Sequence, residues 1–88
     1  MQEFIGERVI VEVRLRQQEA SLPVAFVWRG RRFVIESWGR EGDRTEGDTT
    51  MHYFMVQTAG PETWELCLEK EKAQWTLRRR WARQQRRV

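Results

Sequence analysis

Residues 26–35 have the sequence FVWRGRRFVI, in which two apolar runs flank three arginines and one glycine. If Arg29 and Gly30 form a two-residue turn, three cross-strand pairs follow: Trp28 with Arg31, Phe26 with Phe33, and Val24 with Ile35. This register collects the large apolar residues on one face, which favours a β-hairpin. Gly30 supplies the positive φ that such a turn needs. A glycine-bulge turn, which shifts the register by one residue, is the alternative.

The alternation of apolar and polar residues continues on both sides of this hairpin and predicts further strands. The predicted strands cover residues 8–16, 24–28, 32–38, 51–58, 63–70 and 75–81. In the first of them Val9, Val11, Val13 and Leu15 share one face. Residues 39–50 contain no apolar side chain and are predicted to form a long exposed loop.

Strands at this short spacing predict an all-β fold, a single antiparallel meander of five or six strands. The meander is expected either to close into a small barrel or to stay an open, strongly twisted sheet. Residues 1–81 are predicted to form this one small domain, in keeping with a length of 88 residues. Residues 82–88 are predicted to form a basic C-terminal tail, either a short helix or frayed.

The sequence carries no sign of export. A lone cysteine, Cys67, cannot form an internal disulfide. We expect no leader, because the first residues mix acidic and apolar side chains. We also expect no membrane span, because no apolar run approaches the roughly 18 residues that a span needs. The expectation is a cytoplasmic protein without a membrane partner.

Charge is distributed unevenly along the chain. Residues 1–71 contain nine Lys and Arg and thirteen Asp and Glu, which gives −4, whereas residues 72–88 contain seven Lys and Arg and no acidic residue, which gives +7. A basic end on an acidic body indicates an anionic partner, either nucleic acid or an acidic protein surface. A tail that only improves solubility is the alternative.

Several of the arginines stand next to tryptophan. Exposed aromatic rings beside arginines are typical of proteins that bind single-stranded nucleic acid. The candidate nucleic-acid-binding residues are Trp28, Arg29, Arg31, Arg32, Arg78, Arg80, Trp81, Arg83, Arg86 and Arg87. Strict alternation places Arg78 and Arg80 on one face of the last strand and Arg79 on the other.

The alternative interpretation of the same residues is structural. Aromatic side chains bring a small β domain the largest buried area per residue, and we expect core packing for Trp38, Trp64 and Trp75. Trp28 and Trp81 fit either interpretation. Some of the arginines would then pair across strands with Glu12, Glu36, Glu65 or Glu69.

No constellation of residues predicts catalysis. His52 and Cys67 lie on successive predicted strands, but a Cys–His nucleophile also needs an orienting group and an oxyanion site, and no motif supplies them. The sequence has no glycine-rich phosphate loop and no metal-binding motif, and the acidic residues of 41–48 lack the spacing of a calcium loop. We therefore expect no enzyme activity, no cofactor and no metal.

The stretch FVWRGRRFVI belongs to a longer pattern. A proline precedes it, the tryptophan of ESW follows it, and the segments HYFMVQT, WELCLEK and WTLRRRW come later. Over about residues 8–81 the chain thereby resembles a small uncharacterised bacterial domain family marked by a W-R-G-R-R motif. Members of that family occur alone and as the C-terminal domain of the Y-family-polymerase-like subunit of the actinobacterial mutasome, a DNA-damage-tolerance assembly. The resemblance implies neither an activity nor catalytic residues.

Charge and resemblance together predict a non-enzymatic accessory or interaction domain associated with DNA metabolism, whose arginines contact nucleic acid. The alternative is a protein–protein interaction module, or a homodimeric structural domain, without a nucleic-acid role. An open sheet in so short a chain leaves edge strands that need a partner or a cover.

Overall fold

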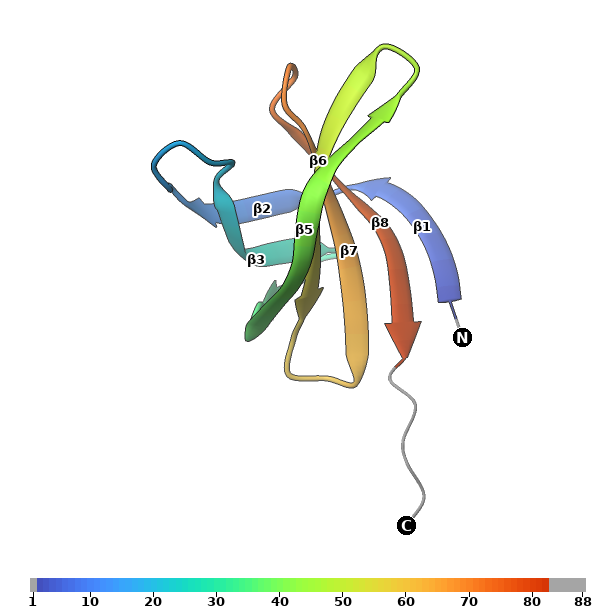
Figure 1. Ribbon diagram of the computed structural model, residues 1–88. Coiled ribbons are helices and arrows are strands. Elements are labelled where there is room, and N and C mark those ends of the chain that lie inside the picture. Colours follow the sequence, from blue (N-terminus) through green and yellow to red (C-terminus); the bar gives the residue numbers. More distant parts are fainter. Residues whose placement is uncertain (1, 83–88) are drawn as a thin grey trace.

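The computed structural model describes residues 2–82 (Figure 1). Of the predicted helical or frayed tail, Ala82 is the last residue of β8, and residues 83–88 lie outside the described residues. Eight strands make up the fold: β1 (Gln2–Arg8), β2 (Ile10–Arg14), β3 (Leu22–Trp28), β4 (Arg31–Val34), β5 (Ser37–Glu46), β6 (Thr49–Gln57), β7 (Glu62–Glu69) and β8 (Gln74–Ala82). The all-β prediction is confirmed. Within residues 2–82 there is no helix, and hence none of the length and apolarity that crossing a membrane requires.

The strands form two antiparallel sheets instead of one. The five-stranded sheet has the order β1-β8-β7-β6-β5, and the three-stranded sheet has the order β2-β3-β4. Figure 1 shows β2 and β3 running across the strands of the larger sheet. The antiparallel prediction is confirmed, whereas the single meander is wrong and the described residues form no closed barrel.

The chain passes between the sheets at two corners. At the first, the Val9 N–H donates to the Trp75 carbonyl at 3.1 Å, so the predicted strand 8–16 divides into β1 and β2. At the second, the Ile35 N–H donates to Val24 of the small sheet, and the Glu36 N–H donates to Gln57 of the large one. Each corner keeps the backbone hydrogen-bonded while the strand direction turns, so alternation along the sequence does not reveal it.

Residues 39–50 are not the predicted loop. Most of them belong to β5 and β6, which pair from Ser37 with Gln57 down to Glu46 with Thr49. Gly47, with φ of 60°, occupies the turn between them. Polar side chains pair across the ladder, as His52 does with Asp43, and this replaces the apolar alternation by which strands are recognised in a sequence.

The β3–β4 hairpin has the predicted register. Trp28 pairs with Arg31 and Phe26 with Phe33, without a register shift, so the glycine-bulge alternative is wrong. Arg29 and Gly30 have φ of 52° and 76°. Two consecutive positive φ values define the type I′ turn, whose twist matches that of the flanking strands.

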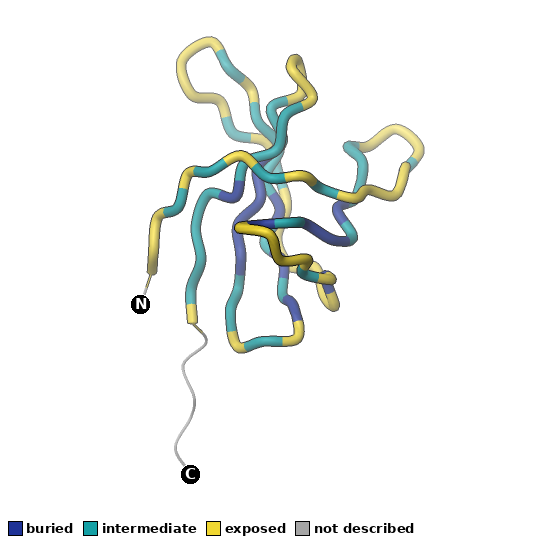
Figure 2. Tube along the Cα trace, turned by 180° about the vertical axis from the view of Figure 1, so that it is seen from behind, coloured by how far each residue is buried: buried dark blue, intermediate teal, exposed yellow. Residues whose placement is uncertain are grey.

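The core lies between the two sheets. Its buried residues are Phe26, Trp28, Ile35, Phe54, Val56, Trp64, Leu66 and Leu77. Figure 2 shows the buried segments meeting at the centre of the molecule, whereas the projecting hairpin tips are exposed.

The three tryptophans that were expected in the core are buried to different extents. Trp64 is 1% exposed, as expected, and Trp75 packs against the core while partly buried. Trp38 is 40% exposed, so the prediction of core packing is wrong for it. Its indole N–H donates to the Pro23 carbonyl at 2.7 Å, which holds the ring near the start of β3 instead.

The expected apolar face of the first strand is right for only half of its members. Val9 and Val11 pack against the core, whereas Val13 and Leu15 are exposed. The pairing of β2 with β3 shifts between Glu12 and Val13. This irregularity, together with the end of β2 at Arg14, turns the last two residues away from the core.

Candidate binding groove

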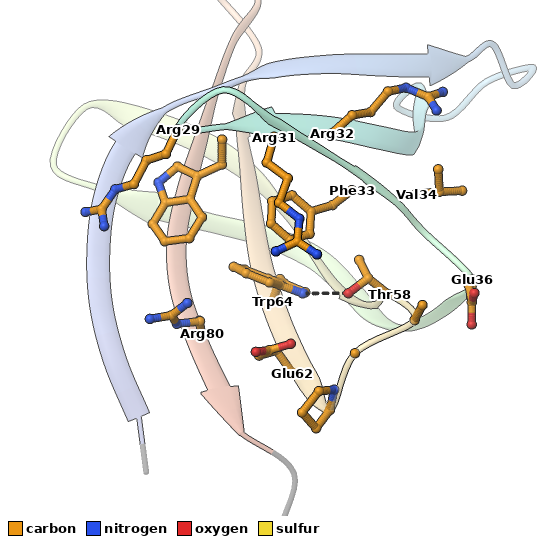
Figure 3. A pocket seen from close by; sticks show the side chains of 14 residues that line it. Arg29, Arg31, Arg32, Phe33, Val34, Glu36, Thr58, Glu62, Trp64 and Arg80 are labelled. Carbon is orange, nitrogen blue, oxygen red and sulfur yellow. Dashed lines mark hydrogen bonds between the residues drawn. The ribbon is translucent and has the colours of Figure 1, made fainter.

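A groove of about 560 Å³ lies between the β3–β4 hairpin and the turn from β6 to β7 (Figure 3). Five of the ten predicted nucleic-acid-binding residues line it: Trp28, Arg29, Arg31, Arg32 and Arg80. All four residues of β4 form one wall, and residues 58–62 form the other. The structure therefore brings half of the predicted residues to one concave site.

Arg80 reaches the groove because of a bulge in β8. Glu65 pairs with Arg79 and Leu66 pairs with Leu77, so Arg78 is an extra residue on the β8 side. Beyond the bulge Arg80 pairs with Trp64, on the side of the sheet that faces the core. The predicted alternation of the last strand is therefore wrong after Leu77, since one inserted residue exchanges the two faces.

Three of the arginines in the groove already hold glutamates. Arg29 donates to Glu7 at 2.9 Å, Arg32 donates to both oxygens of Glu12 at 2.6 and 2.8 Å, and Arg80 donates to Glu3 at 2.9 Å. Hydrogen bonds from Arg29 and then from the Trp28 indole hold the pKa of Glu7 below its usual value, and Arg32 does the same to Glu12. These ion pairs are of the kind that the structural alternative predicted, and one of the glutamates that it named, Glu12, is among the partners.

The guanidinium groups also cover the aromatic residues of the groove. The Arg29 guanidinium lies 4.4 Å from the centre of the Trp28 ring, and that of Arg80 lies 5.3 Å from Trp28 and 5.7 Å from Trp64. Trp28 is consequently only 7% exposed. Cation–π contact of this kind stabilises the arginine positions, but it leaves the Trp28 ring no free face on which a base could stack.

Arg31 differs from the other three. Within residues 2–82 it has no carboxylate partner, and its guanidinium lies 5.2 Å from the centre of the Phe33 ring. Figure 3 shows its side chain reaching into the groove toward Trp64. The Trp64 N–H donates to the Thr58 hydroxyl at 3.1 Å, which fixes the indole below Arg31. The groove thus presents an uncompensated cation above an aromatic floor.

The other predicted residues lie elsewhere. Arg78 donates to Glu46 at 2.9 Å, far along the β5–β6 hairpin. Trp81 pairs with Thr63 on the opposite face of the large sheet, beside Met55 and Arg79. The remaining three, Arg83, Arg86 and Arg87, lie outside the described residues. The described part of the chain therefore does not gather the predicted arginines on one basic face.

Sequence reasoning missed the wall opposite the hairpin. Thr58 and Glu62 line the groove from this wall, and most of residues 58–62 fall between the predicted strands 51–58 and 63–70. No periodicity could place this turn beside the hairpin, because the two belong to different sheets. The signal available was Trp64, whose expected burial implied that its neighbours in sequence would lie near the core.

His52 and Cys67 do not form a reactive pair. His52 pairs with Leu68 and Cys67 with Tyr53, so adjacent positions in the ladder send the two side chains to opposite faces. Burial raises the pKa of the Cys67 thiol to about 11. Among residues 2–82, no three His, Cys, Asp or Glu side chains gather closely enough to hold a metal ion.

One known protein family matches the chain. The pattern of the domain of unknown function DUF6504 matches residues 1–86, nearly the whole length. The chain belongs to the DUF6504 family. The resemblance to an uncharacterised domain family is confirmed by this match. No curated protein and no solved structure matches the chain.

Proposed function

We propose that this DUF6504 chain is a non-enzymatic interaction module that binds an anionic segment of a partner protein in the groove. The observation that carries the proposal is Arg31, a cation without a carboxylate partner in the described chain that points into an aromatic-floored groove. A guanidinium gains from a partner carboxylate, because the hydrogen bonds between them are charge-assisted and bidentate.

The charges of the other arginines support a protein partner. Seven arginines pair with carboxylates within the fold: Arg16, Arg29, Arg32, Arg44, Arg78, Arg79 and Arg80. Since Arg83, Arg86 and Arg87 lie beyond residue 82, residues 2–82 carry thirteen Lys and Arg against thirteen Asp and Glu. Such a balanced surface does not attract phosphate backbones over a distance.

The family resemblance supports a cytoplasmic role in an assembly. Because the family that the chain resembles includes the C-terminal domain of a mutasome subunit, this chain would act as an accessory domain in DNA metabolism. The proposal includes no catalytic step, no cofactor and no membrane partner.

The test is a selection from a random peptide library displayed on phage, against the immobilised full-length chain. We expect enriched peptides with an acidic residue, and at least tenfold weaker binding of those peptides to Arg31→Ala, since a charge-assisted hydrogen bond is lost. Arg14→Ala is the matched control, because Arg14 is an exposed arginine of β2 away from the groove. Equal binding to both variants would refute the groove as the site.

Nucleic acid is the second candidate partner, and the basic end of the sequence favours it, with +7 over residues 72–88. The experiment is a titration of the full chain with single-stranded and duplex DNA at low and high salt. A phosphate-binding tail requires affinity that falls with salt and with deletion of residues 82–88. Lack of binding at low salt would exclude this partner.

A further inference from the structure

Strand β4 is one of the two edges of the three-stranded sheet, and β2 is the other. Strand β4 pairs with β3 alone, from Trp28 with Arg31 to Ala25 with Val34, and nothing in residues 2–82 pairs with its other side. The Ile35 N–H donates to Val24 at 3.0 Å, so alternate residues of this strand bond to β3. In an antiparallel ladder the residues between them point the other way. The N–H and C=O groups of Arg32 and Val34 therefore face outward.

This edge is short and carries two arginines, which discourage strand pairing, but it lacks two other protecting devices. The pairing of β3 with β4 shows no bulge, and the strand contains no proline. Val34 is 51% exposed, which adds apolar surface beside the free backbone groups. A regular, uncovered edge is a template for a further strand.

The same edge forms one wall of the groove. Arg31 and Phe33 share the side of β4 that faces Trp64, while Arg32 extends away from it toward Glu12 (Figure 3). A strand laid along β4 would present every second side chain to Arg31 and the aromatic floor. Backbone pairing and side-chain recognition would thus occur together at one site.

We infer that the occupant of the groove is an extended segment of a partner protein, which adds to the small sheet as a strand along β4 and places an acidic side chain against Arg31. The inference rests on the proposed function and specifies its binding mode. Charge complementarity selects the acidic residue near the hairpin. Glu36 and Glu62, which also line the groove, select a basic or polar residue elsewhere in the segment.

Nucleic acid fits this site less well. It has no regular row of amide donors and carbonyl acceptors to match Arg32 and Val34. Guanidinium groups cover Trp28, and Trp64 is 1% exposed, so bases find little aromatic surface for stacking. DNA binding that competes with the selected peptides and is lost in Arg31→Ala would overturn the inference.

The first experiment removes the outward donor of β4. Val34→Pro deletes the N–H that faces solvent and keeps the pairing with β3, as proline is tolerated at edges with that orientation. We expect at least tenfold weaker binding of the selected acidic peptide. Val34→Thr, which retains the N–H, is expected to bind within about twofold of the parent. Thermal unfolding of both variants shows whether the hairpin is intact.

The second experiment removes the matching groups of the peptide. Methylation of alternate backbone nitrogens in the selected peptide blocks strand pairing on one edge, and we expect one of the two alternate methylation patterns to abolish binding while the other leaves it unchanged. In hydrogen-exchange measurements by NMR, the amides of Arg32 and Val34 are expected to become protected when the unmodified peptide binds.

The outcomes separate this inference from the proposed function. Binding that depends on Arg31 but tolerates both methylation patterns and Val34→Pro would keep the proposed function and overturn strand addition. Absence of any peptide that depends on Arg31 would overturn both.

Discussion

Glu65 of β7 is a charged residue in a buried position. It is 2% exposed and lies on the face of the large sheet that points away from the core, opposite Trp64 and Leu66. Arg44 approaches it at 3.2 Å and Arg79 at 3.4 Å. Because a buried carboxylate is stable only with such partners, these two arginines belong to the fold and not to a binding surface.

We predict that Glu65→Gln lowers the free energy of unfolding by about 1–3 kcal/mol, since two guanidinium groups lose the negative charge of their ion-pair partner. Urea denaturation measures the change. Glu71→Gln, an exposed residue of the β7–β8 turn, is the control and should change stability by less than about 0.5 kcal/mol. A similar effect of both substitutions would contradict the structural role of Glu65.

The lowered pKa of Glu41 makes the stability of the fold depend on pH in the acidic range. Hydrogen bonds from the Arg16 guanidinium, and then from His52, lower the pKa of its carboxyl to about 2 from an ordinary value of 4.5. Because the folded pKa lies below the unfolded one, the stabilisation is complete above pH 4.5 and is lost as pH falls toward 2. In Glu41→Gln the stability should therefore fall less steeply between pH 4.5 and pH 2 than in the parent chain.

The measurement is the midpoint of thermal unfolding as a function of pH, compared with Glu71→Gln. If the midpoint of Glu41→Gln fell with pH as steeply as that of the control, the Arg16–Glu41 pair would not form in solution.

Among the elements, the β3–β4 hairpin agrees most closely with prediction, because its register depends only on local chemistry. One glycine and the alternation of apolar residues were sufficient to define it. We predict that Gly30→Ala lowers the free energy of unfolding by about 1–2 kcal/mol, because φ is 76° and an added Cβ has no close neighbour, which leaves backbone strain as the cause.

Gly39→Ala is the matched control for this hairpin prediction. Gly39 has no positive φ, and its added Cβ would meet the Met55 carbonyl at an ordinary contact distance of 3.5 Å. Chemical denaturation should therefore show a change well below that of Gly30→Ala. A larger loss for Gly39→Ala would mean that the turn does not have the type I′ geometry.

Other elements could not be predicted from local pattern. The strand β5 carries polar residues whose partners lie far away in sequence, such as Arg16 for Glu41 and Arg78 for Glu46. The bulge at Arg78 leaves no mark in the sequence pattern, but it exchanges the faces of the sheet to which the later residues of β8 point. Both features depend on which strands become neighbours, and alternation within one strand contains no information about that.

In the molecule as a whole, Trp64 joins the two sheets. It belongs to β7, and its ring lies 5.3 Å from Phe26, 5.7 Å from Trp28 and 5.0 Å from Phe33 of the small sheet. The small sheet has three short strands and depends on these contacts to bury its apolar face. The two sheets should therefore unfold together.

We predict that Trp64→Ala lowers the free energy of unfolding by about 3–5 kcal/mol through loss of buried area and creation of a cavity. Trp64→Phe, which keeps an aromatic ring but loses the hydrogen bond to Thr58, should lose less. Denaturation followed by circular dichroism and by fluorescence should give one midpoint in each variant. Two separate transitions would show that the sheets are independent.

By itself the sequence determined the strand class of the fold, the hairpin register, the family pattern and the contrast between an acidic body and a basic end. These properties depend on neighbours in the chain or on composition, so the sequence alone is sufficient to predict them. Only the tertiary structure decided that the strands divide into two sheets and that seven arginines form ion pairs with carboxylates. It also decided that Arg31 points into a groove and has no carboxylate partner within residues 2–82. The physical reason is that pairing between distant strands selects the neighbours of each side chain, and those neighbours decide whether an arginine is structural or free to bind.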